Sequence, residues 1–386
     1  MKNCLLIIFS VVLAVTLCGC WDNIEIDDVA SVLAIGVDLA DDDKMNFTIQ
    51  IVVPRLLQQK GYEKNATITY SATGRTFQEA LEKIQATSSR EISVGHIQLV
   101  VLGCAFAKKG IFDIVDYAER SHEFRVQASV VVAKNITAKT ILETSSILEI
   151  FPSVHIMKTI KNKSHIGMTR NVSFLDMINE LNNEGRHLVL PTIESKVTNK
   201  PKYVKDLRIN GFALFQNEKL ICFVTDSNAI QGYLWVIDDI KDGILFVSSP
   251  DNPEEFISLD TLRSKTKTDV NLVDNEFVLS VKVREEGNIS EQQSTSNFTT
   301  PDMITYLENA KSNSIKNKIK DIFVVSQKVY QLDIFGFGDI VSKKYPKKWK
   351  EIKSEWDEIF SNSPTQIEVY SKIRRSGQIQ QPTQTQ

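Results

Sequence analysis

The residues that point most directly to chemistry lie near the start of the chain, where Leu17-Cys18-Gly19-Cys20 ends an apolar run. A leucine three positions before a cysteine, followed by small residues, is the pattern of a lipobox. The small residues let an extended backbone enter a narrow peptidase site, and the Cys20 thiol is a nucleophile that can accept a thioether-linked diacylglycerol. We therefore expect cleavage before Cys20 and lipidation of its side chain.

The segment before Cys20 has the features of a secretory signal peptide spanning residues 1–19. Lys2 and the amino terminus supply a small positive charge, and the apolar run from Cys4 to Thr16 is shorter than the roughly 20 residues that cross a bilayer. An uncleaved signal anchor and an incidental cysteine are the alternatives. Because a diacylglyceryl cysteine carries two acyl chains, it binds a membrane stably, whereas one chain binds only reversibly.

Motifs for catalysis are absent from the sequence. It contains no HExxH pair for zinc, no GxSxG elbow for a serine nucleophile and no GxxxxGK[ST] loop for a nucleotide phosphate. Gly336-Phe337-Gly338 starts a GxGxxG pattern, but Val341 stands at the third glycine position, so we interpret it as a turn. We expect no catalytic residue, no metal and no cofactor beyond the covalent diacylglycerol and N-acyl chain on Cys20.

Composition narrows the class of partner. The chain has 45 basic and 48 acidic side chains, and removal of the leader takes away only Lys2, so the mature protein is mildly acidic. That balance argues against a nucleic-acid partner. Cys104 and Cys222 both lie among apolar residues, which favours buried free thiols, although a disulfide between them stays open. Lysines are also clustered in residues 343–353, and we interpret them as a solvent-exposed helix face in preference to a contact with anionic lipid.

The elements that must carry these residues alternate between strands and helices in the first half. Thr76 and Glu79 have the spacing of a capping box at the start of a helix, and the stretch with His155 and His165 is expected to be a loop. Expected strands are Val29–Leu39, Met45–Pro54, Ala66–Ala72, Ile92–Leu102, Val126–Ala133 and Leu188–Ile193. Expected helices are one that starts at Thr76 and carries the apolar stripe Phe77, Ala80, Leu81 and Ile84, then Phe106–Arg120, one or two within Ile136–Ile150, and one from Ser173 to about Asn183.

The second half is predicted to begin with a hairpin, Arg208–Gln216 and Lys219–Thr225, followed by a helix capped by Asp226. A strand-rich stretch covers Ile244–Arg284. Thr300-Pro301 is a strong helix start for a helix reaching about Leu332. We expect four segments: the signal peptide 1–19, an N-terminal α/β region 20–200 (one or two lobes), a C-terminal α/β domain 205–375, and a disordered tail 376–386. The expected class is mixed α/β (α+β) and multi-domain, with antiparallel or mixed sheets packed by helices.

The mature amino terminus resembles that of the Ger(x)C family, the C-subunit lipoproteins of spore germinant receptors. The resemblance rests first on Cys20-Trp21-Asp22-Asn23-Ile24-Glu25, followed by Ala34-Ile35-Gly36-Val37-Asp38. It continues in the same order through Gly74-Arg75-Thr76-Phe77, Arg90, Gly95-His96 and Phe124-Arg125. It ends with Asp333-Ile334-Phe335-Gly336-Phe337-Gly338, Trp349 and Trp356. The matching residues Trp21, Asp22, Glu25, Arg75, Arg90, His96, Gly336, Gly338, Trp349 and Trp356 are the candidate structural or interaction residues.

The resemblance implies a receptor of three subunits, of which two, A and B, are integral membrane proteins. The C subunit would be a lipid-anchored ectodomain on the outer face of the spore inner membrane, needed for nutrient-triggered germination and without catalytic activity. A lipid-anchored solute-binding protein of a transporter is the alternative, but that class needs two similar lobes and the sequence shows no duplication. The resemblance identifies neither the germinant nor the surfaces that contact the other subunits.

Overall fold

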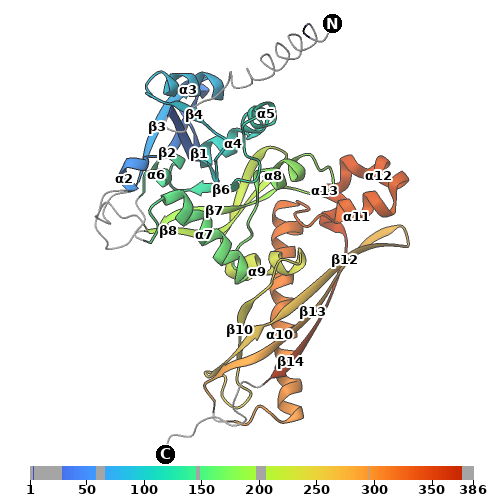
Figure 1. The fold of residues 1–386 in the computed structure, drawn as a ribbon. Helices are drawn as coiled ribbons and strands as arrows, with labels where there is room; N and C mark the ends of the chain where they lie inside the picture. The colour runs from blue at the N-terminus through green and yellow to red at the C-terminus, as the bar shows by residue number, and fades with distance from the viewer. Residues whose placement is uncertain are drawn as a thin grey trace, which may run out of the picture.

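The computed structural model describes residues 28–57, 66–144, 148–196, 206–294 and 296–375, together with Asn3. Two β-sheets with packed helices form its two main parts (Figure 1). The lipobox, Trp21, Asp22 and Glu25 lie outside the described residues, as do most of the leader, segment 197–205 and tail 376–386. Within the described ranges, no helix is long and apolar enough to cross a membrane.

The first sheet is mixed, with strand order β3-β2-β1-β5-β6-β7-β8-β9 and β4 beside the start of β1. Strands β1, β4, β5, β6 and β7 run parallel to one another, whereas β2 and β3 are added antiparallel at the β1 side, and β8 and β9 follow antiparallel after β7. The bounds are β1 Val29–Leu39, β2 Met45–Val52, β3 Thr67–Gly74, β4 Glu91–Ser93, β5 Leu99–Leu102, β6 Ser129–Lys134, β7 Val189–Lys196, β8 Asp206–Gln216 and β9 Lys219–Val224.

Helices cover both faces of this sheet, which explains why β5 and most of β6 are buried on both sides. One apolar core joins α3, α4, α5 and α8 to one face, and a smaller core joins α6 and α7 to the other. The bounds are α2 Pro54–Leu57, α3 Phe77–Gln85, α4 Cys104–Lys109, α5 Phe112–Arg120, α6 Ala138–Leu142, α7 Pro152–His165 and α8 Phe174–Leu181.

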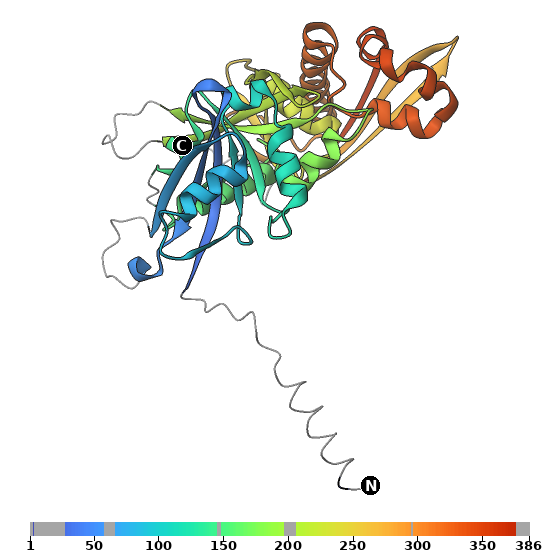
Figure 2. The same cartoon turned by 90° about the horizontal axis from the view of Figure 1, so that it is seen from above.

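The second sheet is built around the long strand β13, whose inward residues alternate with outward ones and pack against α10. β12 pairs antiparallel with β13, and β14 pairs parallel with its other edge. Figure 2 shows this part on the far side of the molecule from the start of β1. The bounds are β10 Gly243–Ser248, β11 Phe256–Thr261, β12 Arg263–Val273, β13 Glu276–Gln292, β14 Thr365–Arg375 and α10 Pro301–Phe323.

Ion pairs of two neighbouring glutamates, Glu285 and Glu286, lie on β13 in the second part. Lys311 Nζ and Glu285 Oε1 lie 2.5 Å apart with both side chains fully buried. Burial is the main cause that raises the pKa of Glu285 and lowers the pKa of Lys311. At the next residue of β13, hydrogen bonds from Arg374 and Arg263 lower the pKa of the partly exposed Glu286 to about 2.

The other helices of more than three residues lie between the two sheets and beside the second one. They are α9 Ser227–Val236, the π-helical segment η3 Val324–Tyr330, α11 Phe337–Lys344, α12 Pro346–Ile352 and α13 Trp356–Asn362. The helix that begins at Pro301 therefore changes to π geometry after Phe323, and Gln331 ends it with a left-handed backbone.

The mixed α/β, multi-domain class is confirmed, and three local predictions are wrong. Ile92–Leu102 forms two short strands instead of one, because the chain turns at Gly95 between them. Phe106–Arg120 is divided into α4 and α5 at Gly110, whose φ of 138° is incompatible with a helix. The stretch with His155 and His165 is helix α7, started by Pro152 at its first position.

The expected division of the chain near residues 200–205 falls between β7 and β8. These strands are antiparallel neighbours, so the first sheet takes strands from both sides of that position. Residues 206–224 thus complete the first sheet before the chain enters the second part. This arrangement places the ends of α8 and the loop before β7 against the helices of the carboxy-terminal half.

Candidate functional site: a polar junction between the two halves

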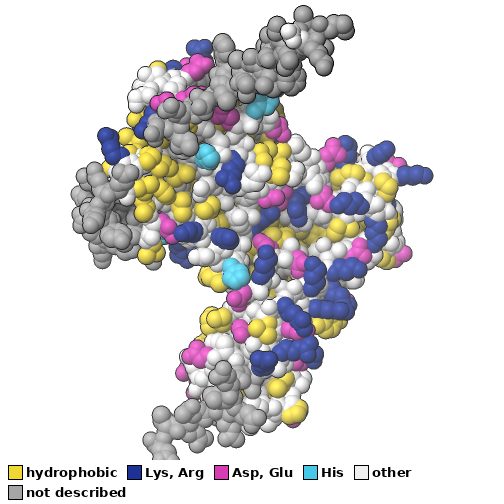
Figure 3. Space-filling view, in the orientation of Figure 1, with side chains coloured by type: hydrophobic (Ala, Val, Ile, Leu, Met, Phe, Trp, Pro, Cys, Tyr) yellow, Lys and Arg dark blue, Asp and Glu magenta, His cyan; other side chains and the backbone are white. Residues whose placement is uncertain are grey.

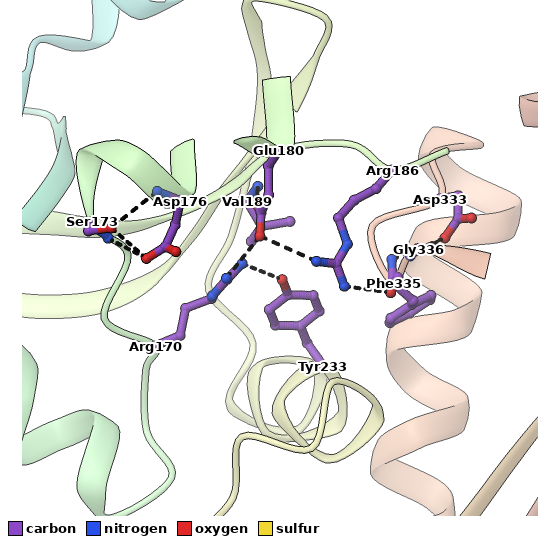
Figure 4. Close-up of polar contacts among 10 residues, drawn as sticks. All are labelled: Arg170, Ser173, Asp176, Glu180, Arg186, Val189, Tyr233, Asp333, Phe335 and Gly336. Atoms are coloured by element: carbon purple, nitrogen blue, oxygen red, sulfur yellow. Dashed lines mark hydrogen bonds and ion pairs between the residues drawn. The ribbon is translucent and has the colours of Figure 1, made fainter. Parts of the chain in front are cut away.

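A buried polar network lies where α8 and the segment before β7 meet α9 and the loop before α11 (Figure 4). We call it the junction. It is defined by Arg170, Glu180, Arg186, Tyr233 and Asp333, with the residues they contact. These residues come from both halves of the chain.

Glu180 anchors the amino-terminal side of the junction. It lies at the end of α8, a helix positioned by a full capping box between Ser173 and Asp176. Its carboxylate accepts a 2.9 Å bond from Arg170 and a 3.5 Å bond from Arg186, while Arg170 also donates to the Tyr233 hydroxyl at 3.0 Å. Burial opposes the charge of Arg170, but Tyr233 and Glu180 outweigh it and raise the pKa of Arg170.

Asp333 anchors the carboxy-terminal side and is fully buried. Its Oδ1 accepts the backbone N–H groups of Phe335 at 3.1 Å and Gly336 at 2.9 Å. Its Oδ2 accepts the N–H of Gly338 at 2.8 Å and the indole N–H of Trp356 at 3.0 Å. Burial raises the pKa of Asp333, and these four donors oppose that rise by stabilising the carboxylate.

The chain bends sharply around this carboxylate. Gly336 has a φ of 88°, a left-handed conformation that favours glycine, and it directly precedes α11. The aromatic residues of the loop then pack around it: Phe335 and Phe337 lie against Phe323 with ring centroids 4.7 and 6.0 Å apart. The predicted turn is confirmed at Gly336, whereas Phe337 and Gly338 already belong to α11.

Segment 184–187 joins the two anchors directly. Arg186 donates to the Phe335 carbonyl at 2.7 Å, and the His187 backbone N–H donates to the Asp333 carbonyl at 2.8 Å. The His187 ring lies 2.7 Å from Asp357 of α13. At Gly185 the backbones approach so closely that a Cβ there would lie 2.5 Å from the Asp339 nitrogen. These contacts therefore fix the position of the amino-terminal half relative to the carboxy-terminal half.

The geometry of the junction supports positioning and offers no catalytic constellation. The oxygens of Asp333 accept hydrogen bonds from N–H groups, and Glu180 pairs with two arginines. In these contacts neither carboxylate is placed beside a nucleophile that it could deprotonate as a general base. Across the described ranges, no group of three or more His, Cys, Asp or Glu side chains is placed to hold a metal ion.

The predicted site residues fall into three sets. Gly336, Gly338 and Trp356 gather around Asp333, and Trp349 packs edge-on against Trp356 with ring centroids 5.6 Å apart. Arg75, Arg90 and His96 are exposed on turns of the first part and do not join the junction. The third set, Cys20, Trp21, Asp22 and Glu25, lies outside the described residues.

The lysine cluster of residues 343–353 includes several contacts within the protein. Lys344 donates to Asp269 and the Val270 carbonyl, and Lys353 pairs with Glu184 at 2.8 Å. Figure 3 shows lysine and arginine side chains gathered over this region and the second sheet. Cys104 and Cys222 are free thiols, as predicted, but each is partly exposed.

Sequence reasoning missed Arg170, Glu180 and Tyr233, because they lie far apart along the chain and carry no local motif. Asp333 begins the segment Asp333–Gly338 that resembles the family, but the resemblance alone does not distinguish it as a functional residue. An acidic residue directly before a glycine-rich turn in an otherwise apolar stretch was the available signal.

The fold and the junction together define a mixed α/β protein of two joined parts, whose main buried polar network holds those parts in place. Comparison with known families gives the identity. Residues 22–195 match the family described as "Spore germination protein N-terminal domain". Residues 210–377 match the family described as "Spore germination B3/GerAC like, C-terminal". The chain belongs to this GerAC-like family of spore germination proteins.

Individual relatives agree over almost the full length. Spore germination protein KC of Bacillus subtilis (strain 168) is 26% identical, with 97% of this chain and 96% of the relative covered. Spore germination protein A3 of the same organism is 25% identical over 94% of this chain and 95% of the relative. The crystal structure of the GerBC protein shares the fold, with a TM-score of 0.56, 17% identity, and coverage of 88% of this chain and 96% of that one.

Proposed function

We propose that this protein is the lipoprotein C subunit of a spore germinant receptor and is required for nutrient-triggered germination. The observation that carries the proposal is the end-to-end match of both halves to spore germination proteins. The junction supports it as well, since its geometry suits a rigid interaction subunit and lacks a catalytic constellation. The proposed subunit is not an enzyme and acts beside the integral A and B subunits.

The proposal includes the location and the covalent modification. Lipid on Cys20 would hold residues 21–386 at the outer face of the spore inner membrane, after removal of leader 1–19. The two family matches support a division into an amino-terminal region, 20–200, and a carboxy-terminal domain, 205–375. The tail 376–386 is proposed to be disordered.

The structure gives a reason to prefer this function over a solute-binding protein of a transporter. That class requires two similar lobes around a hinge. In the described residues the first sheet is mixed and covered by helices on both faces, whereas the second is built on β13 and packs against α10. Because the two parts differ in topology, they do not form such a pair of lobes.

Two experiments test the proposal. Deletion of the gene, together with its paralogues, should abolish or slow germination with at least one nutrient, and unchanged germination with every nutrient would refute the receptor function. Cys20→Ala should move the protein from the membrane fraction to the soluble fraction after a salt wash. Cys104→Ala is the matched control, because that free thiol lies in the folded part, and it should leave the protein sedimenting with membranes.

A further inference from the structure

A cavity of about 500 Å³ is lined by residues of α3, α5 and the segments next to them. Both helices pack into the larger apolar core of the first sheet. Its volume lies within the range of small-molecule sites, roughly 300–1,000 Å³. The cavity is distant in sequence from every residue of the junction, and nothing in the proposed receptor role uses it.

The inner surface of the cavity is apolar and aromatic. Met45 and Phe77 are buried beneath it, and Tyr117 packs against Phe77 with ring centroids 5.5 Å apart. Phe112 also lines the cavity and is 65% exposed, whereas Ile114 and Val115 of the same helix are buried. The four apolar and aromatic side chains that line the cavity can enclose the apolar body of a ligand.

Charged side chains of both signs line the cavity. Arg75 comes from the turn before α3, and Asp113, Asp116 and Arg120 come from α5. Asp116 is held by Arg120 through bonds of 2.9 and 3.0 Å. The Arg75 guanidinium interacts with the Glu79 carboxylate only through its charge, without a hydrogen bond. The Asp113 carboxylate has no hydrogen bond to another described side chain, and both side chains are exposed and can bind a ligand.

Arg75 differs in this respect from the residues around it. Gly74 is required because a Cβ would lie 2.8 Å from the Ala80 nitrogen, and Thr76 caps α3 through the Glu79 backbone. The Glu79 carboxylate accepts the backbone N–H of Arg75 at 2.8 Å, one residue earlier than a capping box requires. Only the last of these contacts involves Arg75, through its backbone N–H, and none uses its side chain.

We propose that this cavity binds a small zwitterion, an α-amino acid with a large apolar or aromatic side chain. The carboxylate of the ligand pairs with Arg75, its ammonium group pairs with Asp113, and its side chain lies between Phe112 and Tyr117. A guanidinium binds a carboxylate through two parallel N–H donors, which gives the site its orientation. The inference goes beyond the receptor role proposed above and does not depend on it.

The test is calorimetric titration of the full, lipid-modified chain in detergent with L-phenylalanine, L-leucine and L-methionine. At least one should bind saturably below about 10 mM. L-phenylalaninamide lacks the carboxylate and N-acetyl-L-phenylalanine lacks the ammonium group, and each should bind at least about tenfold more weakly, the effect of losing one charge-assisted hydrogen bond. Arg75→Gln and Asp113→Asn should weaken binding of the parent amino acid by a similar factor.

Arg90→Gln is the matched control, since Arg90 is also an exposed arginine on a turn beside α3 but does not line the cavity. It should leave binding unchanged, and all variants should keep the melting temperature of the parent chain. The proposal is overturned if none of the three amino acids binds, if Arg75→Gln binds like the parent, or if the N-acetyl analogue binds as tightly as the free amino acid. A deletion strain that still shows the germination defect would separate that outcome from failure of the receptor role.

Discussion

Replacement of Asp333 by asparagine isolates the contribution of the buried carboxylate to the junction. The substitution preserves the size of the side chain and one oxygen, but it places an NH₂ group where the second oxygen was. Two of the four N–H donors then face another donor instead of an acceptor.

The magnitude follows from those contacts. A hydrogen bond to a charged group contributes roughly 1.5–3 kcal/mol, so the loss of two corresponds to about 3–6 kcal/mol. The neutral amide is cheaper to bury than a carboxylate, which offsets part of the loss. We expect Asp333→Asn to lower the free energy of unfolding by about 3 kcal/mol, a large share of the 5–15 kcal/mol typical of a domain.

Urea unfolding followed by tryptophan fluorescence measures the effect, because Trp349 and Trp356 lie at the site. Trp356→Phe removes one donor and should cost about 1–2 kcal/mol alone. In the Asp333→Asn background the same change should cost at least about 1 kcal/mol less, since the partner is already lost. Asp302→Asn, at an exposed helix start, is the control and should cost less than about 1 kcal/mol.

Two results would refute this reasoning. One is a loss below about 1 kcal/mol for Asp333→Asn, which would mean that the four donors find other partners. The other is strict additivity with Trp356→Phe, which would mean that the indole does not depend on the carboxylate.

Three further predictions address other parts of the molecule. Gly185→Ala should destabilise the protein by about 1–3 kcal/mol and speed hydrogen exchange around residues 333–339. Gly95→Ala should be tolerated, because a Cβ there would have no neighbour nearer than 3.6 Å, and equal effects of the two substitutions would contradict the close approach at Gly185. Lys311→Met should cost about 3–5 kcal/mol by leaving Glu285 buried and unpaired, and adding Glu285→Gln should recover part of it in the same unfolding assay; a larger loss in the double variant would oppose this. The Glu286 carboxyl group should titrate near pH 2 when followed by carboxyl-carbon NMR. The free energy of unfolding should therefore contain its full contribution above the ordinary pKa of 4.5 and lose it as the pH falls toward 2, whereas a midpoint near 4.5 would show that the arginine contacts do not form in solution.

Local chemistry determined much of the secondary structure. The strand at Val29–Leu39, the hairpin that follows it and the helix capped by Asp226 all follow from short-range patterns, and the structure has each of them. The mistakes occurred where a local signal competed with another. Gly110 lies inside an amphipathic pattern that continues past it, so periodicity joined two helices that a single backbone angle separates.

The amino-acid sequence by itself determined the lipobox pattern, the mixed α/β class and the family, because each depends on residues close together or on a pattern repeated along the chain. Only the tertiary structure decided that β8 and β9 complete the first sheet, that Glu180 and Asp333 belong to one junction, and that Arg75 and two aspartates line one cavity. Such contacts join residues separated by tens to more than a hundred positions. Their partners are selected by packing and by the need to satisfy buried polar groups, which no local pattern records.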